Sequence, residues 1–269
     1  MRNRITSILT VLILVLTVGV AGLKAAKAQT YIPLAQLQSG DLIRGQTFPA
    51  VYYYGKDGFR YVFPNFNTYK TWYGEDFSTV KWLTDADLGK IQIGGNVTYR
   101  PGVKMIKINS DPKTYAVGKD GELRWVSTEA VAVAMYGSNW NTKIDDMPDG
   151  FFGNYKKGDD IVAASDFSPS SETAAIATIN ADKDLESATY VSATDSGFQP
   201  QTVTISAGRV IKWTNNGTVK HTVTADDLKW GSGTMDLGVS FQRRFDSVGT
   251  YTYFDSYNSN LTGTVVIVQ

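Results

Sequence analysis

Short runs in which apolar and polar residues alternate recur over residues 185–269. Ile211 and Trp213, for example, alternate with polar Lys212 and Thr214, as in a strand with one buried face. Glycine and asparagine separate the runs and are typical of tight turns. Strands are therefore expected at 188–193, 202–205, 210–214, 221–225, 239–245, 249–254 and 263–268. This number of short strands predicts a β-sandwich.

Residues 29–162 contain an internal repeat with a period of 63 to 64 residues. The sequence YYYGKDG at 52–58 returns as YAVGKDG at 115–121, and RYV at 60–62 returns as RWV at 124–126 after a one-residue shift. The Asp-Gly pair within each copy predicts a hairpin turn with positive φ. We expect the two copies to bury their aromatic faces against one another, with two separate small domains as the alternative.

A short helix is expected after each hairpin. In the first copy Asn67 is the expected N-cap of a helix at 68–73, and in the second copy Ser127 or Thr128 is the expected N-cap of a helix at 129–136. Further helices are expected at 85–90, after Thr84, and after Asp146, with Pro148 in the first turn.

These patterns divide the chain into an aromatic-rich two-repeat domain at 29–162, a small, polar linker at 163–184 and a β-rich domain at 185–269. The predicted fold is mainly β, with a C-terminal Greek-key sandwich and an N-terminal α+β domain of two hairpin–helix repeats.

The N-terminus resembles a targeting segment. Basic residues at 2 and 4 precede an uncharged apolar run at 5–23, and Ala26-Lys27-Ala28 fits a signal-peptidase site. We therefore expect residues 1–28 to be a signal peptide and the mature protein to be periplasmic, on the cell surface or secreted. The alternative is an uncleaved anchor, which would be the protein's only membrane contact.

Charge and composition exclude several classes of function. Lysine plus arginine and aspartate plus glutamate both number 26, so no basic excess predicts nucleic-acid binding. The chain has no cysteine and one histidine, His221. Cysteine catalysis and disulfides are excluded, and any Ser-His-Asp triad would need His221, around which no nucleophile motif occurs. We expect a protein that is not an enzyme.

The C-terminal domain resembles the small cupredoxins of the plastocyanin and amicyanin type. The resemblance is carried by GFQP at 197–200, VIKWTNN at 210–216, HTVT at 221–224 and the ending GTYTYF at 249–254 followed by GTVV at 263–266. The family implies a copper ion bound by two histidines, a cysteine and a methionine. Here His221 stands at the first ligand position, and Asp255, Asn258 and Leu261 stand at the other three.

This residue set predicts a cupredoxin-like domain without a blue-copper centre, because the thiolate, one imidazole and the thioether are replaced. We expect no cofactor, and we expect His221 to be structural, bonded to Asp255 or Asn258. The alternative is weak copper or zinc binding by His221 and Asp255, in a protein related to electron transfer.

Aromatic residues of the repeats form either the core of each copy or a binding platform. Tyr53 and Tyr54 have no aromatic counterparts in the second copy, so they are the candidate ligand-binding aromatics. Together these features predict an exported envelope or cell-surface protein that acts as a binding or structural module, with an extracellular protein or a glycan as its partner. A hydrolase of a surface polymer is the second alternative.

Overall fold

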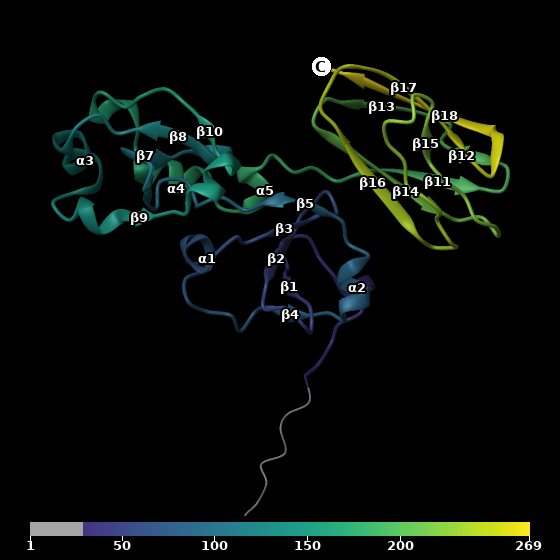
Figure 1. Cartoon of the computed structure of the whole chain (residues 1–269), viewed down its shortest axis with the longest axis horizontal. Coiled ribbons are helices and arrows are strands. Elements are labelled where there is room, and N and C mark those ends of the chain that lie inside the picture. The colour runs from purple at the N-terminus through teal and green to yellow at the C-terminus, as the bar shows by residue number, and fades with distance from the viewer. Residues whose placement is uncertain (1–28) are drawn as a thin grey trace, which may run out of the picture. The chain divides into compact units, whose positions relative to one another are not determined.

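The computed structural model describes residues 29–269. The expected signal peptide at 1–28 lies outside the described residues. Within the described part, no helix is both long enough and apolar enough to span a bilayer. The described chain is mainly β, as predicted, and its four sheets each combine parallel and antiparallel strand pairs (Figure 1).

The first repeat is a five-stranded sheet with two short helices. The strand order is β4-β1-β2-β3-β5. The elements are η1 (Leu34–Gln36), β1 (Leu42–Arg44), β2 (Val51–Tyr54), β3 (Arg60–Val62), α1 (Phe66–Tyr73), β4 (Lys81–Trp82), α2 (Asp85–Gly89) and β5 (Ile93–Asn96).

The second repeat has the same topology. Its sheet has the order β10-β8-β7-β6-β9, which read backwards matches the first repeat strand for strand. The elements are β6 (Met105–Ile108), β7 (Asp111–Val117), η2 (Lys119–Gly121), β8 (Glu122–Trp125), α3 (Glu129–Tyr136), η3 (Trp140–Lys143), β9 (Ile144–Asp146), η4 (Asp149–Asn154) and β10 (Lys156–Lys157).

Strand register shows that the hairpins of the two copies align without a shift. Tyr52 pairs with Val62 in the first copy, and Tyr115 pairs with Trp125 in the second. Each residue of the second pair therefore lies 63 positions after its counterpart in the first pair. The expected one-residue shift at RYV and RWV is therefore wrong, because hydrogen bonding aligns Trp125 with Val62. The predicted positive φ at the turns is confirmed, since Gly58 and Asp120 have φ of 84° and 54°.

The helix caps follow the same offset. Asn65 Oδ1 accepts the Thr68 N–H at 2.9 Å, so α1 begins two residues earlier than expected and Asn67 is not its cap. Thr128 caps α3 by accepting from the Val131 N–H, as predicted. The expected helix after Asp146 is a 3-10 helix, and Pro148 precedes it.

Each repeat has its own aromatic core. In the first copy Tyr53, Tyr61 and Tyr69 pack in one buried cluster, whereas Tyr99 and Tyr115 belong to a separate cluster formed by residues of the second copy. The expectation that the copies bury their aromatic faces against one another is therefore wrong. Helical residues of the same copy pack against each hairpin instead, Tyr69 of α1 in the first copy and Phe152 of η4 in the second.

The segment expected to be a flexible linker is folded. It contains η5 (Ala164–Asp166), α4 (Pro169–Ala175) and α5 (Ile179–Asp182), and it buries Ile176 and Ile179. Ser168 and Thr178 cap the two α-helices. Small polar residues here act as helix caps, which composition alone does not distinguish from linker residues.

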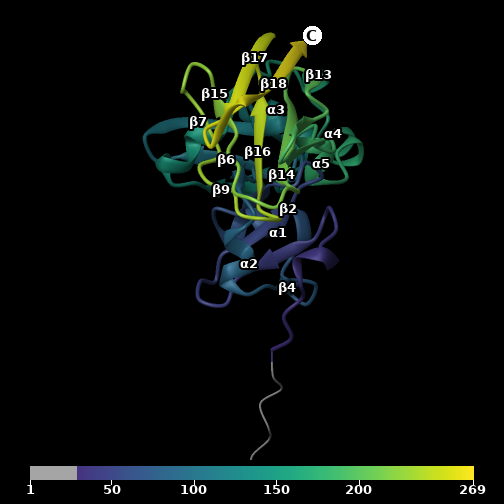
Figure 2. The same cartoon turned by 90° about the vertical axis from the view of Figure 1, so that its right-hand side faces the viewer.

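The C-terminal domain is a sandwich of two four-stranded sheets, with orders β12-β11-β14-β16 and β13-β18-β17-β15. Its strands are β11 (Thr189–Thr194), β12 (Gly197–Gln199), β13 (Thr202–Ser206), β14 (Arg209–Asn215), β15 (Thr224–Ala225), β16 (Ser240–Phe245), β17 (Gly249–Asp255) and β18 (Asn258–Val268). Figure 2 shows β16, β17 and β18 in a view turned by 90°. The fully buried Trp213 ring lies in the core between the sheets, with its centroid 5.4 Å from that of Tyr253.

Three details of the sandwich differ from the sequence prediction, and one of them is the short strand β12, which was not expected. The strand expected at 221–225 is reduced to β15, because His221 forms only an isolated bridge with Met235. In addition, β18 begins at Asn258 rather than Gly263 and pairs with β17 up to Asp255. Only Ser256 and Tyr257 therefore separate β17 from β18, in a tight hairpin.

Candidate functional site

His221 lies at one end of the sandwich and is 3% exposed. Its backbone is fixed by two hydrogen bonds with Met235, of 3.2 and 2.8 Å. Its Nδ1 atom lies 2.7 Å from Oδ2 of Asp255, the last residue of β17, which is 1% exposed. Two of the four positions that the resemblance singled out are thus joined directly.

A second carboxylate reaches the other side of the imidazole ring. Oδ1 of Asp195, in the turn between β11 and β12, lies 3.1 Å from Nε2 of His221. Thr218 holds Asp195 in place through its N–H, at 2.8 Å, and its hydroxyl, at 2.6 Å. We call His221, Asp195 and Asp255 the histidine clamp.

Backbone donors satisfy the remaining oxygen of Asp255. Its Oδ1 accepts the N–H groups of Thr222, at 2.9 Å, and Tyr257, at 3.0 Å. The Thr222 hydroxyl lies a further 3.3 Å away. A buried carboxylate needs such hydrogen-bond donors, and here one comes from the residue after His221 and the other from the β17–β18 turn.

The clamp favours a protonated histidine. Burial by itself disfavours the charged ring, but the hydrogen bonds to Asp255 and Asp195 outweigh it and raise the pKa of His221. Hydrogen bonds from Thr218, followed by that from His221, lower the pKa of Asp195 to about 2. Both ring nitrogens face carboxylate oxygens, so a doubly protonated ring can donate one hydrogen bond to Asp255 and one to Asp195.

Asn258 and Leu261 take no part in the clamp. Asn258 is exposed, and its side-chain oxygen accepts the Asn260 N–H at 3.3 Å. Leu261 is half-buried against the sandwich core. Hydrogen bonding between His221 and Asn258, one of the two expected alternatives, is therefore wrong, because the hairpin directs Asn258 into strand pairing opposite Asp255.

These residues do not fit a copper ion. A metal needs an imidazole nitrogen with a free lone pair, and both nitrogens of His221 are bonded to carboxylates. Within residues 29–269, no group of three or more histidine, cysteine, aspartate or glutamate residues is arranged to hold a metal ion.

The sequence did not indicate Asp195, Thr218 or Thr222. Asp195 precedes His221 by 26 positions in a polar turn, and its residue type is common in turns. The only signal was chemical: a lone buried histidine beside one carboxylate leaves its second nitrogen in need of a partner.

The candidate aromatic platform does not form as predicted. Tyr53 is 1% exposed and belongs to the core of the first repeat, so the prediction of a surface role for Tyr53 is wrong. Strand alternation explains this, because Tyr53 points to the buried face of β2. Tyr54 is half-buried and packs against a second apolar cluster that includes Leu83.

Comparison with known proteins relates part of this chain to cupredoxins and plastocyanins. Residues 170–268 match the family model for the cupredoxin-like domain. The chain is 32% identical over 89 residues to plastocyanin from Scenedesmus fuscus, a match covering 27% of this chain and 91% of that protein. It is 34% identical over 89 residues to chloroplastic plastocyanin from Tetradesmus obliquus, a match covering 27% and 61% of the two chains.

A solved structure is also similar in part. A purple cupredoxin from Nitrosopumilus maritimus is 20% identical, with a TM-score of 0.28, over 29% of this chain and 98% of that one. The resemblance that the sequence motifs indicated is confirmed by the family match and the plastocyanin relatives. The family match begins at residue 170, within α4, rather than at the expected boundary of 185.

Proposed function

The chain belongs to the cupredoxin-like family through residues 170–268, and we propose that this domain works without copper, as a rigid binding or structural module. The histidine clamp carries this proposal. In it, a proton on His221 balances two carboxylates that would otherwise repel each other, the buried Asp255 and the exposed Asp195.

Loss of redox chemistry follows from the residues themselves. A blue-copper centre depends on a thiolate, and the chain has no cysteine. Asp255, at the thiolate position, is instead saturated by His221 and by backbone N–H donors. The domain keeps the packed sandwich core around Trp213, which provides rigidity without a metal.

For the whole protein, we propose an exported protein of the cell envelope or surface that binds an extracellular protein or a glycan and is not an enzyme. The basic start and apolar run at 2–23 support export. The balanced charge and the absence of cysteine support a non-catalytic role that involves no nucleic acid.

Copper titration of residues 29–269 tests the copper-free assignment. Calorimetry with Cu²⁺ should show no tight stoichiometric binding, and the protein should stay colourless and show no shift of its thermal midpoint. The matched variants are His221→Ala and Lys220→Ala, because Lys220 is the exposed neighbour with only a surface ion pair to Asp236. Stoichiometric binding that His221→Ala abolishes and Lys220→Ala preserves would overturn the proposal.

Nitrogen-15 NMR of the histidine ring gives a second, independent readout. At about pH 6, below the raised pKa of His221, both ring nitrogens should be protonated and the two signals should have the shifts of an imidazolium. A neutral ring with one unprotonated nitrogen would contradict the charge state on which the clamp depends.

A further inference from the structure

The two repeats place a pocket at the same position. The first pocket, of about 600 Å³, and the second, of about 440 Å³, each lie between the start of a strand, the end of its hairpin partner and the N-terminus of α1 or α3. Every residue lining the second pocket except Met105 has a counterpart 63 positions earlier in the first, as with Pro49 and Pro112. The pocket is therefore a feature of the repeat itself.

One of these counterparts changes the content of the pocket. In the first copy, the Tyr69 ring stacks on Phe77, with centroids 4.4 Å apart and planes inclined by 7°. The corresponding residues of the second copy are Ala132 and Trp140. The second copy thus keeps a larger aromatic platform and lacks the side-chain ring that covers it in the first.

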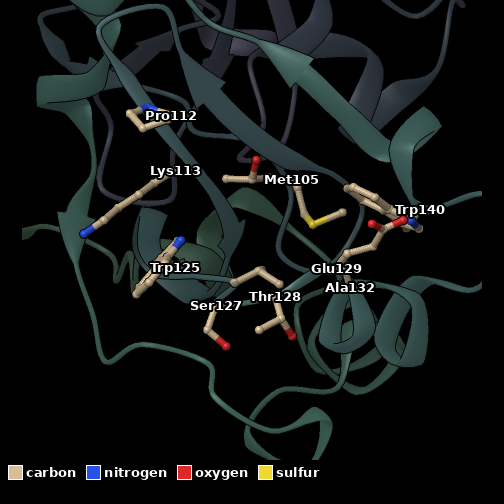
Figure 3. Close-up of a pocket in the computed structure, with 11 residues that line it drawn as sticks. Met105, Pro112, Lys113, Trp125, Ser127, Thr128, Glu129, Ala132 and Trp140 are labelled. Carbon is tan, nitrogen blue, oxygen red and sulfur yellow. The ribbon is translucent and has the colours of Figure 1, made fainter.

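Figure 3 shows the walls of the second pocket. Trp125 and Trp140 lie on opposite sides, and Met105 lies between them. Ser127, Thr128 and Glu129 form one edge of the pocket, where the first copy has Pro64, Asn65 and Phe66.

The charges in this pocket cancel. Lys113 lies over the Trp125 ring, with its ammonium nitrogen 4.6 Å from the ring centroid. Glu129, at the first position of α3, is exposed and has no hydrogen-bond or ion-pair partner among the described residues. With one positive and one negative group, the site selects neither a cation nor an anion by net charge.

We propose that the pocket of the second repeat binds a ring of a neutral saccharide. The C–H face of a sugar ring would stack on Trp140, where Tyr69 stacks on Phe77 in the first repeat, and its hydroxyls would bond to Glu129 and Ser127 at the edge. Aromatic walls with a few convergent polar groups are the usual composition of a small-ligand site. This inference names the partner class within the proposed envelope role, and it depends on neither the histidine clamp nor the absence of copper.

The test measures binding of soluble hexasaccharides to residues 29–269. The probes are the β-1,4-linked hexamers of glucose and of N-acetylglucosamine and a mannose hexamer, titrated by calorimetry with tryptophan fluorescence as a second signal. At least one should bind to the unmodified protein. Trp140→Ala and Ala132→Tyr should each weaken that binding by about tenfold or more.

Ala132→Tyr is the decisive variant, since the first copy accommodates a tyrosine at this position of its helix. Ala134→Tyr, on the exposed side of the same helix, is the matched control and should bind like the unmodified protein. Failure of all three hexamers to bind at millimolar concentration would overturn the proposal, as would binding that survives both pocket variants. Binding of a proline-rich or lysine-rich peptide in the pocket, with no sugar bound, would overturn the saccharide assignment. If Trp140→Ala fails to fold, Glu129→Ala at the exposed edge provides the second measurement.

Discussion

Nδ1 of His221 lies 2.7 Å from Oδ2 of Asp255 in the buried end of the sandwich, at two positions where the resemblance implies copper ligands. The pair replaces coordination by a charge-assisted hydrogen bond, and Asp195 completes it from the opposite side of the ring. The consequences of this arrangement can be measured through the pH dependence of stability and through close packing around the ring.

The clamp should make stability depend on the protonation of His221. The pKa of His221 is raised above its ordinary value of 6.5 in the folded state. Its stabilisation is therefore fully present below pH 6.5 and is lost as the pH rises through the folded pKa. Urea unfolding should show that His221→Gln destabilises the protein more at about pH 6 than at about pH 9.

Asn258→Ala serves as the control, because Asn258 is exposed and outside the clamp. Its effect should not vary with pH. If His221→Gln lowers the free energy of unfolding by the same amount at both pH values, the ring does not act as an imidazolium.

Gly217→Ala should disrupt the clamp sterically. A Cβ atom at Gly217 would lie 2.6 Å from Nε2 of His221 and still closer to Oδ1 of Asp195. We expect a loss of about 1–3 kcal/mol in the free energy of unfolding, together with a lower pKa of His221 in an NMR titration. Gly150→Ala, where a Cβ meets nothing within 4 Å, is the control, and equal behaviour of the two variants would contradict the prediction.

Asp182→Asn should stabilise the protein at neutral pH. The Asp182 side chain is fully buried, and burial raises its pKa from 3.8 to about 6, although it accepts the Asp120 N–H at 2.8 Å. Because the folded pKa is raised, stability that is present below pH 3.8 is lost as the pH rises through about 6. The shift corresponds to about 3 kcal/mol, of which asparagine should recover about 1–3 kcal/mol at pH 7.

Chemical unfolding at about pH 4 and pH 7 checks this prediction, since the gain should appear at the higher pH only. Asp149→Asn, at an exposed position, should leave the free energy of unfolding unchanged at both pH values. Destabilisation by Asp182→Asn at neutral pH would mean that the carboxylate is required in its charged form.

Asn65→Ala and Thr128→Ala should each destabilise the protein by about 1 kcal/mol, because each removes the side-chain acceptor of a helix N-terminus. Asn67→Ala should have little effect, since Asn67 is exposed within α1. Thermal unfolding measures these losses of stability. A larger loss for Asn67→Ala than for Asn65→Ala would show that Asn67 is the N-cap, as expected from the sequence.

The local sequence pattern predicts which helices and strands form more accurately than it predicts the residues at which they begin and end. Thr128, one of the two caps that the sequence predicts for α3, is the observed cap. In the first copy the sequence favours Asn67, whereas the observed acceptor is Asn65. The sandwich strands were expected at close to their observed positions, whereas β12 was not expected and β18 is longer. Both differences arise in tight hairpins, because β12 pairs with β11 up to Gly197 and the added start of β18 pairs with β17 up to Asp255. Apolar–polar alternation does not show how close to a turn the strand pairing continues.

Burial of individual side chains also depended on tertiary structure. Two adjacent tyrosines, Tyr53 and Tyr54, look equivalent in the sequence, but the face of β2 that is covered decides that Tyr53 is fully buried. Likewise, the polar composition of 163–184 did not reveal that Ile176 and Ile179 would be buried.

The sequence by itself determined that no blue-copper centre can form, because a missing thiolate is a fact of composition that no fold can change. It also determined the repeat, because copied residues imply copied hairpins. Only the tertiary structure placed Asp195 against His221 and left Ala132 beside Trp140 in a pocket. Distances between turns are set by sheet pairing and core packing over the whole domain, and separation along the chain does not encode them.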